Sequence, residues 1–231
     1  MKYNIEDKQI FKLHKRYISD YVSVVIFLLC VYLSIFMISF SFCFTSSYVY
    51  GESMKPTINN YADYEHNRDV VYIDKNASYT YGDIIVIKKN DIEIIKRVIA
   101  LPGDTIDIKN VDGKYVVMRN DQVLEEDYIR IVPGSADYNG MAKEYALFQN
   151  YKESHKNDDN LFVDKEHYLQ SAIRVRDGEV FVLGDNRHNS DDSSTEGSFA
   201  MSDVVGKVEI IVRAGKSSLI ALLNYFYNPF K

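Results

Sequence analysis

The first pattern in the chain is a long apolar run near its start. Residues 21–44 are 24 residues without a charged side chain. A helix of this length rises about 1.5 Å per residue and spans about 36 Å, more than the ~30 Å hydrocarbon layer of a bilayer. A cleaved signal peptide differs, because its apolar core is about 7–15 residues long and ends at a small-residue cleavage site. The pattern therefore predicts one transmembrane helix over residues 21–44.

Basic side chains are distributed unequally around this run. Five Lys or Arg residues precede it, at positions 2, 8, 12, 15 and 16, whereas Lys55 is the only one in the twenty residues that follow it. Lys and Arg concentrate on the cytoplasmic side of single spans. We therefore expect residues 1–20 to be a cytoplasmic segment and residues 45–231 to lie outside the membrane.

After residue 45 the chain changes to short segments of β-branched and aromatic residues separated by turn signals. This pattern is typical of an antiparallel β domain. The expected strands are Asp69–Ile73, Ile84–Lys88, Glu93–Ala100, Thr105–Ile108, Tyr115–Met118, Glu179–Leu183 and Val204–Val212. Residues 133–170 are polar without sustained periodicity, so they are expected to form an excursion from the sheet or a small subdomain.

The last stretch, residues 217–230, is apolar and aromatic but too short to span a bilayer. The first interpretation is a strand packed on the core. The alternative is an aromatic edge that contacts the outer lipid surface.

Composition excludes several classes of function. The formal net charge is −6, so the chain offers no basic surface for nucleic acid. Both cysteines, Cys30 and Cys43, lie inside the apolar run, which leaves the rest of the chain without a thiol for a disulfide, a zinc site or cysteine catalysis. Charged surface loops contain His and Asp mixtures by chance, so no metal site is expected from the group His155, Asp158, Asp159, Asp164 and His167.

Ser53 is a candidate nucleophile. It lies nine residues past the apolar run, and Pro56 makes the adjoining turn rigid. The usual general base would be histidine, but His14 is on the expected cytoplasmic side and His66, His155 and His167 lie in polar loops, so that His188 alone is in a segment that resembles a site.

Lysine in its neutral form can replace histidine as the base. Lys96 is the best candidate, because it stands in the otherwise apolar segment 92–101, where burial would disfavour its charge. The alternative is that Lys96 and Arg97 are solvated charges on an edge strand.

Four blocks of sequence, in this order, resemble the bacterial type I signal peptidases, the Ser-Lys leader peptidases of family S26. They are Ser-Met-Lys-Pro-Thr at 53–57, Tyr-Gly-Asp-Ile-Ile-Val at 81–86, Lys-Arg-Val-Ile-Ala-Leu-Pro-Gly-Asp at 96–104, and Gly-Asp-Asn-Arg-His-Asn-Ser-Asp-Asp-Ser at 184–193. Each block alone is weak, whereas four in order behind a membrane anchor are specific.

The resemblance implies roles for individual residues. Ser53 would be the nucleophile, Lys96 its general base and Ser190 a hydroxyl that orients the base. The backbone N–H of Ser53 would donate to the oxyanion. The supporting charged framework of the last block would be Asp185, Arg187 and Asp192. We expect shallow apolar pockets for the substrate, with Met54, Ile58, Ile94 and Ile95 as candidate walls.

Two departures from the family's pattern bear on this transfer. Gly51 stands where some members have a Ser that completes the oxyanion hole. Ser194 stands where an Arg often pairs with the Asp at the position of Asp192. Neither departure touches Ser53 or Lys96.

The resemblance also implies the fold and the activity. The fold would be mainly β, an antiparallel catalytic domain with a smaller inserted subdomain at about residues 110–178, behind one transmembrane helix. The activity would be cofactor-free removal of signal peptides from exported preproteins at the bacterial cytoplasmic membrane, with the bilayer and the preproteins as partners and a functional monomer.

Other functions remain open at this stage. One is a dedicated Ser-Lys processing peptidase for a single secretion, pilus or conjugation substrate. A self-cleaving repressor would need a DNA-binding domain, which 20 residues before the helix cannot form. A catalytically inactive anchored binding domain would have no use for Ser53, Lys96 and Ser190.

Overall fold

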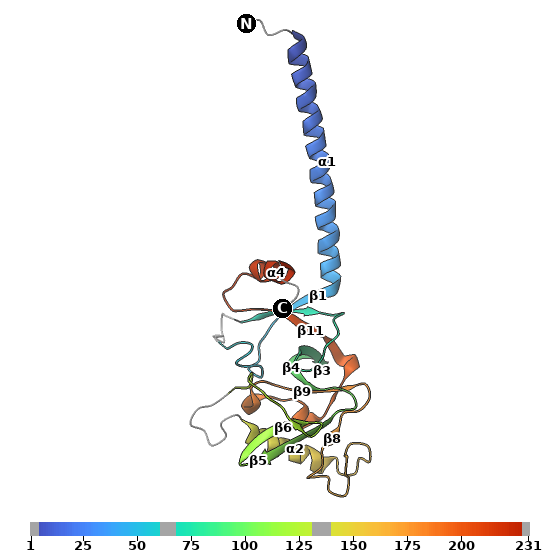
Figure 1. Cartoon of the computed structure of the whole chain (residues 1–231), viewed down its shortest axis with the longest axis vertical. Coiled ribbons are helices and arrows are strands. Elements are labelled where there is room, and N and C mark those ends of the chain that lie inside the picture. Colours follow the sequence, from blue (N-terminus) through green and yellow to red (C-terminus); the bar gives the residue numbers. More distant parts are fainter. Residues whose placement is uncertain (1–4, 61–67, 131–139, 228–231) are drawn as a thin grey trace. The chain divides into compact units, whose positions relative to one another are not determined.

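The computed structural model describes residues 5–60, 68–130 and 140–227, in two units, Met1–Phe44 and Thr45–Lys231. His66 lies outside the described residues. The first unit is a single helix, α1 (Ile5–Cys43), which starts well before the expected residue 21 (Figure 1). Its part Arg16–Cys43 is long and apolar enough to cross a membrane. The hydroxyls of Ser23 and Ser34 donate to carbonyls four residues earlier, so these polar groups are satisfied within the helix.

The second unit is built on a sheet of seven strands in the order β1-β2-β11-β3-β4-β9-β10. The bounds are β1 Phe44–Tyr48, β2 Val70–Asp74, β11 Val204–Val212, β3 Ile84–Lys89, β4 Ile92–Ala100, β9 Glu179–Leu183 and β10 Phe199–Ala200. From β2 to β10, neighbouring strands pair antiparallel. This arrangement confirms the predicted fold class.

A smaller sheet has the order β7-β6-β5-β8, and α2 lies alongside β5 and β6 (Figure 1). Its strands are β5 Thr105–Val111, β6 Lys114–Arg119, β7 Gln122–Val123 and β8 Ile173–Arg174, and the helix α2 is Met141–Ser154. Short helical segments complete the unit: α3 Ser193–Glu196, α4 Ser218–Tyr227, and the 3-10 turns η1 Arg187–Asn189 and η2 Met201–Asp203. The smaller sheet begins at Thr105, somewhat before the expected insertion.

The β3–β4 hairpin fixes the position of Lys96. Asn90 and Asp91 connect the strands with φ values of 47° and 64°, the left-handed pair that a tight hairpin turn requires. The resulting register places Ile85 opposite Lys96. Because a slip by one residue turns every side chain of a strand to the other face, this turn determines where Lys96 points.

Three apolar clusters of buried residues support the described part of the unit, and two of them adjoin the elements discussed below. One joins the smaller sheet and α2 to β4 and β9 of the larger sheet, and in it Phe148 of α2 and Phe181 of β9 meet edge to face with ring centroids 6.2 Å apart. The other lies beneath the Ser53 turn and includes Ile58, Val71 and Ile73, all fully buried. The burial of such side chains contributes roughly 1.5–3 kcal/mol each and anchors the turn to the sheet.

The prediction of a C-terminal strand is wrong, because residues 218–227 form the helix α4. Its half-buried positions are Ser218, Ala221, Leu222 and Tyr225, and their spacing has the helical period. Leu and Ala favour the helix, and α4 packs against β11 through this face.

Candidate active site

Ser53 sits in a tight turn that begins at Glu52, a few residues after the end of β1 at Tyr48. The turn is closed by hydrogen bonds from Lys55 N–H to Glu52 O (3.0 Å) and from Ile58 N–H to Met54 O (2.8 Å). Asn59 braces it from below, because its side-chain amide donates to Val49 O (2.7 Å) and Gly51 O (3.2 Å). The backbone of this turn thus fixes the position of Ser53.

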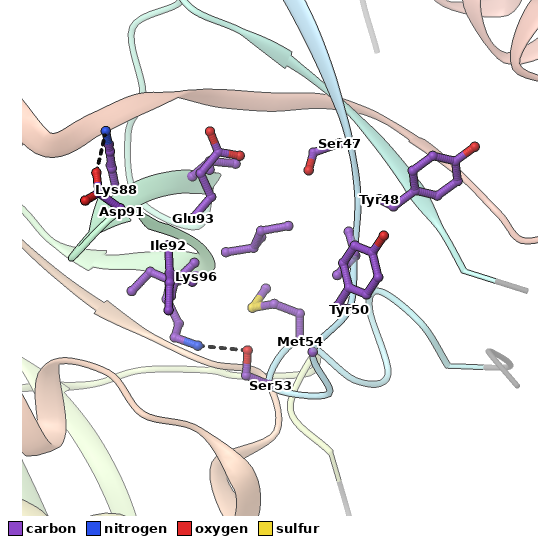
Figure 2. Close-up of a pocket in the computed structure, with 15 residues that line it drawn as sticks. Ser47, Tyr48, Tyr50, Ser53, Met54, Lys88, Asp91, Ile92, Glu93 and Lys96 are labelled. Carbon is purple, nitrogen blue, oxygen red and sulfur yellow. Dashed lines mark hydrogen bonds and ion pairs between the residues drawn. The ribbon is translucent and has the colours of Figure 1, made fainter. Parts of the chain in front are cut away.

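Lys96 meets this hydroxyl from β4. Its Nζ donates to Ser53 Oγ at 2.8 Å, and the two side chains lie together at one end of a pocket (Figure 2). Lys96 is 4% exposed. Burial lowers its pKa from the usual 10.5, and the charges of Asp192 and Asp191 only oppose that shift. The arrangement can therefore supply a neutral amine next to a hydroxyl, which is what a general base requires.

The interpretation of Lys96 and Arg97 as solvated edge charges is wrong. The strand β4 lies inside the sheet between β3 and β9, and both side chains are buried. Arg97 forms two parallel bonds to Asp185, from Nε to Oδ1 (2.8 Å) and from Nη2 to Oδ2 (2.6 Å), and its guanidinium stacks on Tyr128. Asp185 also accepts a hydrogen bond from Thr57, so this pair joins the sheet to the Ser53 turn.

Asp192 accepts hydrogen bonds from both sides of its loop. One of its carboxylate oxygens accepts from the Ser190 hydroxyl and from Gly184 N–H (2.9 Å), and the other from the hydroxyl of Ser194 (2.9 Å) and its N–H (3.1 Å). At position 194, where the resemblance led us to look for an Arg, a serine hydroxyl pairs with Asp192 instead. Ser190 is buried, and its oxygen keeps a lone pair after donating to Asp192.

Arg187 links its loop to a distant segment of the chain. It is fully buried and bonds to Glu126 at 2.5 and 3.2 Å and to the carbonyl of Gly184 at 2.9 Å. The three framework residues therefore have different partners. Asp192 alone contacts Ser190 directly, whereas Asp185 reaches β4 and Arg187 reaches the segment before α2.

The Ser53 turn and the Gly184 loop are clamped together. Asn186 N–H donates to Ser53 O (2.8 Å), and the Asn186 side chain donates to Glu52 O (3.1 Å). A Cβ added to Gly184 would come within 2.6 Å of Ser53 O and 2.3 Å of Ser190 Oγ. Glycine at this position is therefore required by the close approach of the two loops.

A pocket of about 710 Å³ extends from the Ser53–Lys96 pair. Figure 2 shows Met54 beside Ser53, with Tyr48 and Tyr50 on one side and Ile92 and Glu93 on the other. Of the expected walls, Met54, Ile94 and Ile95 line it. Ile58 does not, because it is fully buried in the core beneath the turn.

The turn that holds Ser53 contains an unused backbone donor. Among the described residues, the backbone N–H of Ser53 finds no acceptor. Gly51 also lines the pocket, and a Cβ built there would meet no atom within 4 Å. The site thus has space, but no side-chain donor, at position 51.

The described histidines and the polar residues 140–170 do not form a second reactive site. Within residues 5–60, 68–130 and 140–227, no three His, Cys, Asp or Glu side chains gather as metal ligands. His167 pairs with Asp164 at 3.0 Å, and Asp158 pairs with Arg176. His188 packs against Gly140 at the start of α2 and lies apart from the Ser53–Lys96 bond.

Sequence reasoning missed several residues that shape the site, namely Asn59, Thr57, Glu126 and Glu144. Asn59 carries one signal, since Asn is among the non-glycine residues enriched at positive φ, here 59°. Glu126 and Glu144 carry none, because their partners lie tens of residues away in the chain.

Comparison with known proteins agrees with the geometry. A sequence model of the family described as "Signal peptidase, peptidase S26" matches residues 18–213. The chain is 33% identical to signal peptidase I P of Bacillus subtilis subsp. natto over 178 residues, which cover 74% of this chain and 78% of the relative. It is 30% identical to signal peptidase I S of Bacillus subtilis strain 168, with the same coverage, and 31% identical to signal peptidase I of Streptococcus pneumoniae serotype 4 over 77% of this chain and 86% of the relative. The chain therefore belongs to the signal peptidase family, peptidase S26.

Proposed function

We propose that the chain is a membrane-anchored serine endopeptidase that removes N-terminal signal peptides from exported preproteins with a Ser53–Lys96 dyad. The relatives that bear the name signal peptidase I support this class of activity. One observation carries the assignment of the dyad: a buried lysine with a lowered pKa donates to the hydroxyl of Ser53 at 2.8 Å.

Acylation follows from this contact. Ser53 Oγ attacks the scissile carbonyl carbon while its proton passes to the neutral Nζ of Lys96. The carbonyl oxygen becomes an oxyanion, to which the Ser53 N–H donates. Lys96 then gives its proton to the amine of the mature protein, the C–N bond breaks, and the signal peptide remains as an ester on Ser53.

Deacylation uses the same base. Lys96 takes a proton from a water molecule, whose oxygen attacks the ester carbonyl. The C–O bond to Ser53 then breaks, and Lys96 returns the proton to Ser53 Oγ. Ser190 orients Lys96 in both steps, because its hydroxyl hydrogen is committed to Asp192 and its oxygen can accept from Nζ.

The pocket suits an extended peptide. The strand β4 pairs with β9 only from Arg97 onward in the described part of the chain, so residues 92–95 have a free backbone edge on that side. Ile94 and Ile95 of this stretch line the pocket. A substrate segment can add to this edge as a strand, with small side chains turned toward the apolar wall formed with Met54.

The anchor supports the same conclusion. We place residues 1–20 on the cytoplasmic side, residues 21–44 in the membrane and residues 45–231 outside, with about 110–178 as a non-catalytic insertion. Ser53 follows residue 44 by nine residues, which extend at most about 30 Å. A signal peptide held in the same bilayer is within this reach, and sharing the membrane raises its effective concentration. The function requires one copy of the chain.

The experiment is cleavage of a preprotein reporter by the full chain in detergent or liposomes, with mass spectrometry of the released amino terminus. Ser53→Ala and Lys96→Ala should each abolish cleavage, whereas Ser190→Ala should be partly active. Lys165→Ala is a control, because Lys165 is an exposed lysine that pairs with Asp159 and does not line the pocket.

Three results would contradict the proposal, each in a different part. Cleavage near the wild-type rate in either Ser53→Ala or Lys96→Ala would exclude the dyad. Wild-type protein that binds the reporter without cleaving it would indicate an inactive binding domain. A reporter panel in which a single preprotein is cut would replace general signal-peptide removal with a dedicated processing role.

A further inference from the structure

The inserted helix α2 places one face against the catalytic loops. Its buried residues are Met141, Glu144, Phe148 and Lys152, spaced along one side of the helix. Met141 Sδ accepts from Arg187 Nη1 at 2.9 Å, and Lys143 donates to His188 O at 2.9 Å. The first turns of α2 therefore hold the η1 turn that precedes Ser190.

Glu144 stands out on this face because it is fully buried and forms no ion pair with any residue that the structure describes. Its side chain lies where α2 packs on α3, beside Ser194 and Asp192. Neither carboxyl oxygen makes a hydrogen bond of good geometry with a described residue. A buried ionised carboxylate without a partner is strongly disfavoured, so such a group keeps its proton. Burial and the neighbouring charge of Asp192 raise the pKa of Glu144 to about 8.

A protonated Glu144 completes the hydrogen bonding of this region. The Ser194 hydroxyl donates its hydrogen to Asp192 Oδ1, so its oxygen is left as an acceptor. The acid O–H of Glu144 can donate to that oxygen. The chain of donors then runs from Glu144 through Ser194 to Asp192, which accepts from Ser190 on its other side.

We propose that Glu144 is a positioning residue for the dyad, and that its uncharged carboxyl supports Asp192 through Ser194 while keeping a second negative charge away from Lys96. This inference rests on the proposed function, and it gives the insertion a role in catalysis.

The charges around Glu144 determine the consequence for pH. Asp192 faces it from the start of α3, Arg187 from η1, Lys143 from α2 itself and Lys96 from β4. Arg187 is already paired with Glu126, and Lys152 farther along α2 is paired with Asp107 of β5 at 2.7 Å. Ionisation of Glu144 raises the pKa of Lys96 and so removes neutral base. The acid form thus favours the active form of Lys96.

The test compares Glu144→Gln and Glu144→Ala in the full chain with wild type, using the pH dependence of kcat/KM. Gln keeps the shape and a donor but cannot ionise, so we expect kcat within about threefold of wild type and an ascending limb moved to lower pH. Ala removes the donor. We expect its kcat to fall by up to about tenfold with KM unchanged, because a misplaced catalytic group lowers the rate. Glu153→Gln is the matched control, because Glu153 lies on the same helix and is exposed.

An unchanged ascending limb in Glu144→Gln, or an equal shift in Glu153→Gln, would overturn the proposal. A second measurement, thermal unfolding, does not depend on cleavage. It therefore tests the protonation of Glu144 even if the proposed function is wrong. Folded wild type retains a proton that the unfolded chain loses above about pH 4.5, so its stability falls as pH rises toward 8. The melting temperature of Glu144→Gln minus that of wild type should therefore increase from pH 5 to pH 8. A difference between the two melting temperatures that does not change with pH would contradict a neutral Glu144.

Discussion

The ion pair between Arg97 and Asp185 allows a prediction with a magnitude. The Asp185 side chain is fully buried and that of Arg97 is 11% exposed, and two parallel hydrogen bonds join them. Removing one partner of a buried pair leaves an uncompensated charge, which costs about 3–5 kcal/mol. Since a domain is stable by about 5–15 kcal/mol, Arg97→Ala should lose a large fraction of the free energy of unfolding.

The assay is guanidinium unfolding of the full chain in detergent, followed by the near-UV circular dichroism of its tyrosines. The double variant Arg97→Ala/Asp185→Asn should recover part of the loss, because no buried charge is left unpaired. Lys156→Ala is the control: it breaks an exposed pair with Glu153 and should leave the unfolding free energy unchanged. An Arg97→Ala variant as stable as this control would refute the reasoning.

Three further predictions concern the site. The kcat/KM of wild type should rise with pH through a midpoint below 10.5, because Lys96 must lose its proton and burial lowers its pKa; a midpoint at or above 10.5 would contradict this. Gly184→Ala should abolish cleavage while leaving the far-UV spectrum folded, since its Cβ would push apart Ser53 and Ser190; wild-type activity would show that the loops can separate freely. Gly51→Ser has space for a hydroxyl beside the oxyanion and should raise kcat, by at most the 10²–10³-fold that one donor contributes; a fall in kcat would show that position 51 serves another purpose.

The strands of the catalytic sheet could be predicted closely from the sequence, because their β-branched residues are flanked by turn signals. Observed and expected bounds of β9 and β11 are identical. The helix α2 could not be predicted, since its buried face includes Glu144 and Lys152, which no hydrophobic pattern counts as core. The tail was misread because aromatic residues favour strands locally, whereas its packing on β11 selects the helix.

Only the part of the site that lies in local sequence motifs could be predicted. Ser53 and Lys96 stand in motifs whose residue order carries their chemistry, and the structure brings them into contact. The supports of the site depend on contacts between distant segments, such as Arg187 with Glu126, and no local spacing encodes them. Ile58 was placed in the pocket because it is apolar and near Ser53, but the turn directs it into the core.

The most direct test of the central claim is the single-turnover rate constant for reporter cleavage by Lys96→Met, measured beside wild type at equal fold. Methionine preserves the buried apolar stem and removes the amine that contacts Ser53. A general base contributes about 10²–10⁴-fold, so we predict a rate constant at least about 10²-fold below wild type. A rate constant equal to that of wild type would contradict the account.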